Sequence, residues 1–438
     1  MAALYNNGLN GNPHFLVEGG RPLRGVFKVP GAKNAALPII AGTILAPGRL
    51  TLGRVPDISD VRVMLELLNH MGAEIELDDN GILSIDTTAL KSVPAPYSLV
   101  KKLNASFDIT GALVARFGEA MVPMPGGCVI GTRAVDQHLM GFRLLGCDVR
   151  SEPGGFVAVK ASGLVGNRIR FAKTSVGATK NVMMAACMAR GRTVLENVAR
   201  EPEVVDLANF LAACGASING QGSSRIEISG VRGMSGAGVR YNIISDRLVA
   251  GTYLLAAAIT RGEITATGVE PEHLKAFIRK LRKTGQDLTV GEDFIHLRGV
   301  SPILSAGAVI AEPYPAFPTD LQPPMVAYLS LAQGVSYVKE KIFDMRFNYV
   351  DDLRRMGANI EVDSNTAVVR GVERLMGAPI DAPDIRAGAA LVLAALAAEG
   401  TSQVHGLHFI DRGYEKMEER LSALGASIRR VAGDADRH

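Results

Sequence analysis

The sequence lacks the residues and runs that mark several classes of protein. Its 438 residues include no tryptophan and only four cysteines, and 47 Lys+Arg against 44 Asp+Glu leave a net charge of +3. This near equality of positive and negative charge gives no electrostatic reason to expect nucleic acid or a membrane surface as a partner. The cysteines form no C-x-x-C pair, which disfavours a zinc site or a disulfide framework and fits a reducing cytoplasm.

Long hydrophobic runs are also missing. The most apolar stretch, AGAALVLAALAA from Ala387 to Ala398, is too short to span a bilayer and predicts a buried helix. The N-terminal stretch MAALYNNGLNGNPHF lacks the basic start and apolar segment of a secretory signal. No Walker motif and no dinucleotide-binding G-x-G-x-x-G is found, so a nucleotide-driven motor or a dinucleotide-dependent dehydrogenase is disfavoured. We therefore expect a cytoplasmic protein.

A repeated pattern organises the chain. Six times an amphipathic helical pattern ends at a glycine and runs into a β-like alternation of apolar and polar residues. Glycine at that place predicts a left-handed helix terminator, and stretches such as AEIELDDNGILSID predict hairpins. The intervals between the glycines are 74, 69, 70, 72 and 68 residues. The six are Gly72, Gly146, Gly215, Gly285, Gly357 and Gly425.

A second and more apolar helix recurs in each repeat, as in LVAGTYLLAAAITRG and QPPMVAYLSLAQG, and should be more deeply buried. The period is too long for a solenoid, whose repeats run from about 20 to 50 residues. The chain is also too long for one ordinary core. The sequence therefore predicts an α/β fold of six compact units, three to each of two domains.

Some stretches differ from their counterparts in the other repeats, and chemistry is expected there. In VPGAKNAALPIIAG, Lys33 stands at the start of an apolar helix, where it adds to the positive potential of free N–H groups. An anion site and a solvated surface lysine both fit this pattern. In FAKTSVGATKNVMM, Lys173, Ser175 and Gly177 precede another apolar helix. They suit either a bound phosphate or a simple helix N-cap.

Acidic and basic residues stand out in the C-terminal half. Four prolines stiffen PAFPTDLQPP around Asp320, and an acid on a rigid turn can act as a general base or as a helix cap. Arg346, Arg386 and Arg412 lie between predicted strands and helices, each with an aspartate nearby. They fit either structural salt bridges or a substrate with several negative oxygens, because arginine binds carboxylate and phosphate in a bidentate fork.

One cysteine stands on a flexible stretch. In PMPGGCVIGTRAVD, Cys128 lies among glycines and is followed by Arg133, so its thiol contributes little to a core. Cys147, Cys187 and Cys214 lie within helix or strand patterns and fit inert packing instead.

Nine ordered motifs resemble the UDP-N-acetylglucosamine enolpyruvyltransferases (1-carboxyvinyltransferases) of the EPSP synthase-like superfamily. They are GAKNAALP, LVARFG, PGGCxIGxRxVDxH, KxSVGAT, AREPEVVD, AFPTDLQ, IFxxRF, DxRAxAxLVLA and IDRGYE. The resemblance implies two lobes, each an inside-out α/β barrel of three βαβαββ units. One lobe would span 33–242, with the cysteine loop at about 123–136, and the other 1–32 plus 243–438.

The resemblance also implies an activity. The enolpyruvyl group of phosphoenolpyruvate would move to the 3-hydroxyl of UDP-N-acetylglucosamine with release of phosphate, the first committed step of peptidoglycan synthesis. No cofactor and no metal would be needed, and the partners would be these small molecules alone. The family's roles place Lys33, Arg133 and Arg412 on phosphoenolpyruvate. Arg346 and Arg386 would complete that positive pocket.

Further roles follow from the same resemblance. Asp320 would face the 3-hydroxyl as the base. Cys128 would lie on a closing lid and protonate C3 of phosphoenolpyruvate or form an adduct with it, which implies sensitivity to fosfomycin. Asn34 would hold the sugar, and Ile342 would line the substrate. The residues implied to hold the uracil and the diphosphate are Ala134, Val135, Asp136, Gln137, Lys173, Ser175, Val176 and Gly177.

The chain departs from the family at three positions. Asn104 stands where an arginine near the substrate phosphates is usual, Asp108 where a bulky apolar residue is usual, and Ala134 replaces a common proline. One positive charge lost and one negative charge gained make this region less favourable to a diphosphate. A divergent enolpyruvyltransferase with another acceptor is therefore an alternative, and a non-catalytic paralogue that binds sugar nucleotide is a further one.

Overall fold

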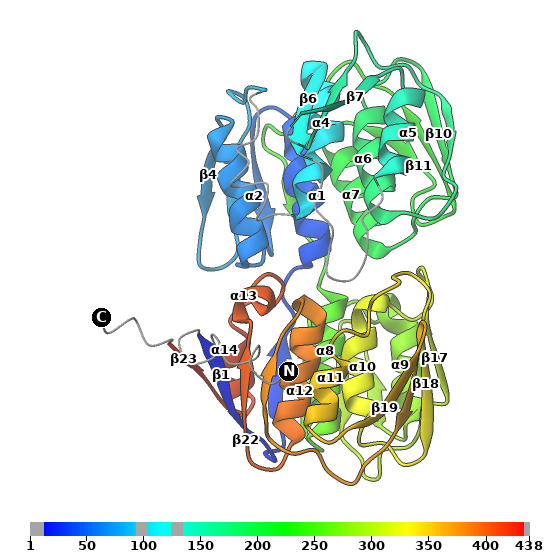
Figure 1. Ribbon diagram of the computed structural model, residues 1–438. Coiled ribbons are helices and arrows are strands. Elements are labelled where there is room, and N and C mark those ends of the chain that lie inside the picture. The colour runs from blue at the N-terminus through cyan, green and yellow to red at the C-terminus, as the bar shows by residue number, and fades with distance from the viewer. Residues whose placement is uncertain (1–12, 93–103, 124–134, 154, 433–438) are drawn as a thin grey trace. The chain divides into compact units, whose positions relative to one another are not determined.

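The computed structural model describes residues 13–92, 104–123, 135–153 and 155–432, and these form two compact units. The described residues 13–29 and 247–432 form one unit, which we call the terminal lobe because it holds both ends of the described chain. The described residues from 30 to 246 form the other unit, which we call the central lobe. Each lobe has its own apolar core, built from its helices and the inward faces of its sheets (Figure 1).

The terminal lobe contains three four-stranded sheets among its described residues. The first has the order β15 (Asp287–Val290), β16 (Phe294–Arg298), β14 (Glu263–Thr267), β2 (Arg24–Lys28). The second has the order β17 (Ala308–Ala311), β18 (Val335–Glu340), β20 (Thr366–Arg370), β19 (Asn359–Asp363). The third has the order β21 (Pro379–Asp381), β22 (Thr401–His405), β1 (His14–Glu18), β23 (Ser427–Val431).

The central lobe repeats this plan in the part of the chain that the structure describes. One sheet has the order β13 (Arg240–Asn242), β3 (Arg49–Gly53), β5 (Leu83–Asp86), β4 (Glu74–Leu77). A second has the order β11 (Ser217–Asn219), β12 (Arg225–Ser229), β10 (Arg192–Glu196), β9 (Arg168–Arg170). The third shows three strands in the order β6 (Glu119–Pro123), β8 (Phe156–Lys160), β7 (Asp148–Glu152).

All five four-stranded sheets have the same pairing, with one parallel edge pair and two antiparallel pairs. The second strand of the hairpin usually follows the first directly in the chain, as β20 follows β19. The third sheet of the terminal lobe differs, because β1 pairs with β23 and so supplies that strand from the other end of the chain. The sixth repeat is thus completed by the N-terminal segment.

The innermost helices are apolar and deeply buried. In the terminal lobe they are α8 (Arg247–Ile259), α10 (Gln322–Leu329) and α12 (Ile385–Ala397), which pack on one another (Figure 1). In the central lobe they are α1 (Lys33–Gly42), α4 (Thr110–Phe117) and α6 (Val176–Ala186). The apolar stretch that predicted a buried helix lies in α12, so that prediction is confirmed.

The amphipathic helices of the six repeats are shorter or more exposed. They are α2 (Ser59–His70), α5 (Asp136–Leu144), α7 (Pro202–Ala213), α9 (Lys275–Lys283), α11 (Val350–Arg355) and α14 (Met417–Ala423). The predicted glycine after each helix has a positive φ, between 85° at Gly285 and 105° at Gly215. Because L-residues adopt this conformation only at a cost, glycine terminates all six helices, as predicted.

Short elements complete the chain: α13 (Leu407–Ile410) and the 3-10 turns η1 (Thr43–Leu45), η2 (Asn104–Ile109), η3 (Pro271–Leu274) and η4 (Thr319–Leu321). Turn η4 lies against α8, where a Cβ on Gly251 would meet Leu321 Cδ1 at 2.5 Å. This close approach holds η4 against the helical core. No helix in the described ranges combines the length and hydropathy needed to cross a bilayer.

Candidate active site

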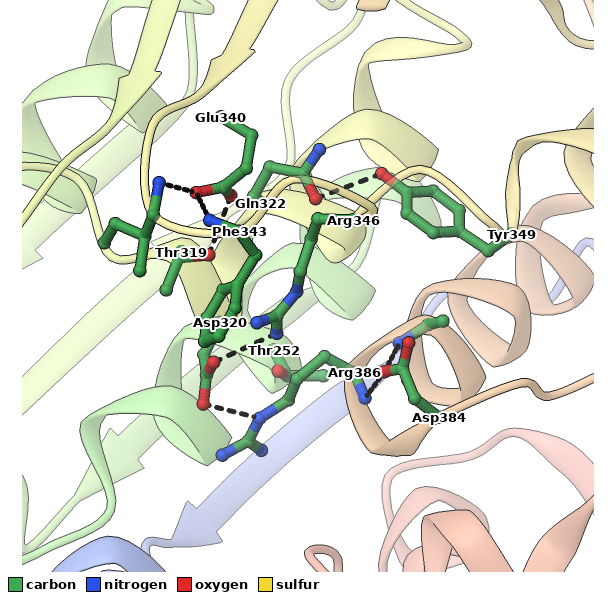
Figure 2. A network of polar contacts seen from close by, with 12 residues as sticks. Thr252, Thr319, Asp320, Gln322, Glu340, Phe343, Arg346, Tyr349, Asp384 and Arg386 are labelled. Atoms are coloured by element: carbon green, nitrogen blue, oxygen red, sulfur yellow. Dashed lines mark hydrogen bonds and ion pairs between the residues drawn. The ribbon is translucent and has the colours of Figure 1, made fainter. Parts of the chain in front are cut away.

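A cluster of one carboxylate and two guanidinium groups lies at the start of α10 in the terminal lobe. Asp320, in η4, accepts a hydrogen bond from Arg346 Nη2 at Oδ1 and one from Arg386 Nε at Oδ2, each 3.0 Å long (Figure 2). The arginine side chains are 3% and 5% exposed and that of Asp320 is 23% exposed. The carboxylate is therefore the member of the cluster that solvent reaches most easily.

The three charged residues come from three separate segments. Arg346 lies in the loop between β18 and α11, and its guanidinium lies 5.0 Å from the centre of the Phe343 ring. Arg386 lies in the first turn of α12, where Asp384 Oδ1 accepts the backbone N–H groups of Arg386 and Ala387 at 2.8 and 3.0 Å. Asp384 is thus the cap of α12, which leaves the Arg386 side chain directed to Asp320.

This geometry removes one of the two interpretations of Asp320, that of a helix cap. Turn η4 and helix α10 have no side-chain cap, so the cap interpretation of Asp320 is wrong. Burial alone would raise the pKa of the Asp320 carboxyl, but the charges and hydrogen bonds of Arg386 and Arg346 outweigh it and hold the pKa below its usual range. Asp320 is therefore ionised at physiological pH.

Two further residues of the predicted pocket lie close by. The segment after α13 wraps the Arg386 side chain: the Tyr414 ring lies 5.3 Å from its guanidinium, and a Cβ on Gly413 would lie 3.8 Å from Nη1. Arg412 directly precedes this contact and is half-buried. Ile342 lies in the same loop as Arg346 and is 39% exposed. The terminal lobe thus brings Arg346 and Arg386 to Asp320, while Ile342 and Arg412 lie on the segments next to these two arginines.

The central lobe holds a different charged pair at the start of α1. Lys33 Nζ lies 2.7 Å from Asp60 Oδ2, with side chains 9% and 6% exposed. The backbone N–H of Lys33 donates to Asp246 Oδ2 at 3.1 Å. The interpretation of Lys33 as a solvated surface lysine is therefore wrong, because it is buried and ion-paired.

Helices α5 and α6 begin side by side and carry most of the remaining predicted residues. The backbone N–H of Lys173 donates to Gln137 Oε1 at 3.1 Å. Ser175 caps α6 by accepting the N–H of Ala178 at 3.2 Å, as the simpler interpretation held. Lys180 Nζ on α6 donates to the Asn34 carbonyl at 3.3 Å. Residues predicted from separate motifs, including Val135, Asp136, Val176 and Gly177, thus lie at three helix N-termini of one lobe.

Buried residues that no local sequence pattern indicated support these helix starts. Asn181 Nδ2 lies 3.1 Å from His138 Nδ1 and donates to the Phe107 carbonyl at 2.8 Å. A Cβ on Gly177 would meet His138 Nε2 at 3.0 Å. The pKa of His138 is lowered to about 4, chiefly by burial and further by the charge of Lys180. The histidine stood in the motif PGGCxIGxRxVDxH, but no local pattern indicated that it is buried and neutral.

Several predicted residues lie outside the described part of the chain. These are Cys128, Arg133 and Ala134, and the side chain of Asn104 is likewise not described. Asp108 lies in η2 and is half-buried. Within the ranges given above, no three His, Cys, Asp or Glu side chains are grouped so as to hold a metal ion.

Comparison with known proteins identifies the class. A family model for EPSP synthase (3-phosphoshikimate 1-carboxyvinyltransferase) matches residues 17–421, so the chain belongs to this family. The structure is similar to that of the enolpyruvyl transferase NikO from Streptomyces tendae, with a TM-score of 0.88 and 25% identity over 97% of this chain and 100% of that one. The protein is an enolpyruvyltransferase, with the predicted two-lobed fold of six repeats.

A more distant likeness concerns the fold alone. EPSP synthase from Acinetobacter baumannii matches with a TM-score of 0.75 and 19% identity, over 96% of this chain and 100% of that one. A second structure of the same synthase matches with the same TM-score and identity over 95% of this chain.

Proposed function

We propose that this enzyme transfers the enolpyruvyl group of phosphoenolpyruvate to the 3-hydroxyl of UDP-N-acetylglucosamine and releases phosphate. The observation that carries the proposal is the carboxylate of Asp320 between two buried guanidinium groups, in a chain that also has the nine ordered motifs. Such a reaction supplies peptidoglycan synthesis and takes place in the cytoplasm, where both substrates are made.

Arg346 and Arg386 provide donors that match the charge of phosphoenolpyruvate, and the resemblance assigns Arg412, Lys33 and Arg133 to the same substrate. An arginine fork binds carboxylate or phosphate through two parallel N–H bonds and stabilises charge that moves to the leaving phosphate. When substrate anions take up these donors, the arginines lower the pKa of Asp320 less. Substrate binding therefore raises the basicity of Asp320 at the moment when a base is needed.

The proposed chemistry balances in two steps. Asp320 takes the proton of the acceptor hydroxyl while the hydroxyl oxygen bonds to C2 of phosphoenolpyruvate, and an acid, Cys128, gives a proton to C3. The tetrahedral adduct then loses phosphate from C2 and returns a proton from C3 to the Cys128 thiolate, which restores the double bond on the acceptor. The proton on Asp320 leaves with the phosphate or passes to solvent. By the same resemblance, a phosphonate epoxide such as fosfomycin would alkylate Cys128.

A second candidate is the same transfer to another nucleotide or sugar acceptor. The departures at Asn104, Asp108 and Ala134 favour it, because they remove a positive charge and add a negative one in the segments that the resemblance assigns to the sugar nucleotide. Both candidates use the same phosphoenolpyruvate site and differ only in the acceptor.

Initial rates of phosphate release decide between them. The enzyme is mixed with phosphoenolpyruvate and either UDP-N-acetylglucosamine, its galactosamine epimer, UDP or uridine monophosphate, and the vinyl protons of the product are observed by proton NMR. We expect release and a vinyl ether with UDP-N-acetylglucosamine. Turnover with another acceptor alone would favour the second candidate, and release with none would contradict both. Asp320→Asn serves as the inactive control.

A further inference from the structure

One buried carboxylate near the site has no part in the chemistry above. Glu340 is the last residue of β18 and is 1% exposed. Its backbone N–H donates to the Asn365 carbonyl at 2.8 Å, and it stands opposite Ala311 in the parallel register of β17 and β18. The sheet therefore fixes the backbone of Glu340, and its side chain lies next to Thr319, the residue before Asp320 (Figure 2).

The two oxygens of Glu340 contact two different segments. Oε2 accepts a hydrogen bond of 2.7 Å from Thr319 Oγ1, in the turn that carries Asp320. Oε1 accepts the backbone N–H groups of Ile342 and Phe343 at 2.7 and 3.3 Å, in the loop that carries Arg346. One carboxylate thus joins the segment of the acidic residue to the segment of one of its two arginines.

The energetics argue that this arrangement is specific. Burial raises the pKa of Glu340, against the opposing effects of Thr319, Ile342 and Arg346, so keeping an acidic group here has a cost. Three hydrogen bonds to one carboxylate offset part of that cost, because bonds to a charged acceptor are stronger than neutral ones. An apolar residue could fill the same space, but it would leave the turn and the loop without a common partner.

We propose that Glu340 is a positioning residue that sets the distance between Asp320 and Arg346 by joining the turn and the loop that carry them. The inference rests on the proposed roles of Asp320 and Arg346 and adds a third residue that does not touch substrate. A shift of about 1 Å at a reacting group can cost about 10²-fold in rate. Loss of the joint should therefore lower kcat without preventing substrate binding.

Three variants separate the contributions of the hydrogen bonds that Glu340 accepts. Glu340→Ala removes all three hydrogen bonds. Glu340→Gln keeps a carbonyl oxygen for the two backbone N–H groups and places an amide next to Thr319 Oγ1, so the geometry is largely kept. Thr319→Val removes only the bond to the turn. Ser336→Ala is the matched control: Ser336 is also buried on β18, and its Oγ accepts the N–H of Ala306 at 3.1 Å, away from the cluster.

Steady-state kinetics of phosphate release give the readout, with melting temperatures measured in parallel. We expect Glu340→Ala to lower kcat by about 10- to 100-fold, with a smaller change in KM for phosphoenolpyruvate. Glu340→Gln should recover kcat to within about fivefold of the wild type. Thr319→Val should lower kcat by less than Glu340→Ala does. The double variant Thr319→Val with Glu340→Ala should lower kcat no more than Glu340→Ala alone, because both changes remove the hydrogen bond between these two residues.

Other results would overturn the inference. Glu340→Ala with kcat within twofold of the wild type would show that the joint does not matter for catalysis. If Glu340→Gln lowered kcat as much as Glu340→Ala, the charge of Glu340 would be responsible. If Ser336→Ala lowered kcat equally, general loosening of β18 would be responsible. If Asp320→Asn itself kept the wild-type rate, the proposed site would fail first, so the two failures are distinguishable.

Discussion

The two lobes hold their central charges in different ways. In the terminal lobe one carboxylate, that of Asp320, binds two guanidinium groups and is partly exposed. In the central lobe one ammonium, that of Lys33, faces Asp60, and both side chains are almost completely buried. Each arrangement lies at the start of an inner helix, α10 in the terminal lobe and α1 in the central lobe. The same position in the fold thus holds a carboxylate in one lobe and an ammonium in the other.

The difference has physical consequences. A buried ion pair has lost most of its hydration, and each member depends on its partners, because an unpaired buried charge is costly. A carboxylate shared by two arginines can release one of them to a ligand and keep the other. We therefore expect changes in the terminal cluster to affect turnover most, and changes in the central pair to affect stability most.

Asp320→Asn should have the largest effect. The amide keeps the size of the side chain but cannot take a proton, and a general base typically contributes about 10²–10⁴ in rate. We expect kcat to fall by at least 10²-fold, while the affinity for phosphoenolpyruvate is kept or increased, because the two arginines lose a competing anion. Rates of phosphate release and titration calorimetry measure the two quantities. An unchanged kcat would remove Asp320 from the chemistry.

Asp60→Asn tests the other side of the comparison. It leaves the Lys33 ammonium buried opposite a neutral amide, and breaking a buried pair by removing one partner costs about 3–5 kcal/mol. We expect the urea midpoint to fall accordingly.

The double variant Lys33→Met with Asp60→Leu is the control for this prediction, because replacing a buried pair by apolar residues is often close to neutral. It should recover most of the stability and yet remain inactive, since the proposed contact with phosphoenolpyruvate is lost. An Asp60→Asn protein as stable as the wild type would show that the pair is not a structural element.

The sequence predicts the repeats well and the charge partners poorly, for a physical reason. Helix periodicity and the terminating glycines are local signals, and all six glycines adopt the predicted conformation. The ion pairs of Asp320 join residues 26 and 66 positions apart, so no local pattern indicated that Arg346 and Arg386 share it. Asp384, the acid nearest to Arg386 in the chain, caps a helix instead. Likewise, the pairing of β1 with β23 depends on closure of the whole lobe.

His138 shows a third arrangement of a titratable group, because the central lobe buries its ring in the neutral form. Its pKa is lowered to about 4 by burial and by Lys180, against the pull of Asp136, whereas an unfolded histidine titrates near 6.5. The resulting stabilisation is complete above pH 6.5 and is lost as the pH falls to about 4. This gap corresponds to at most about 3 kcal/mol.

Urea unfolding between pH 4 and 8 tests this contribution. The variant His138→Gln, which cannot titrate, should lose less stability over that range than the wild type. His70→Gln, on the exposed end of α2 in the same lobe, should behave like the wild type. Parallel curves for wild type and His138→Gln would contradict the burial argument.

The smallest effect is expected from the three described cysteines, all of them in the central lobe. Burial raises the pKa of Cys147 and Cys214 to about 11 and that of Cys187 to about 12. At pH 8 only about one in a thousand such thiols, or fewer, is the reactive thiolate. Iodoacetamide should therefore leave these three unmodified in the native protein and modify all of them in denaturant, as peptide mass spectrometry can show.

Replacing all three by alanine should change kcat by less than about twofold, because none is proposed to meet substrate and only packing is lost. Cys128→Ser, by contrast, should abolish the fast alkylation of the native protein. Rapid native modification at any of the other three would contradict the burial of these thiols.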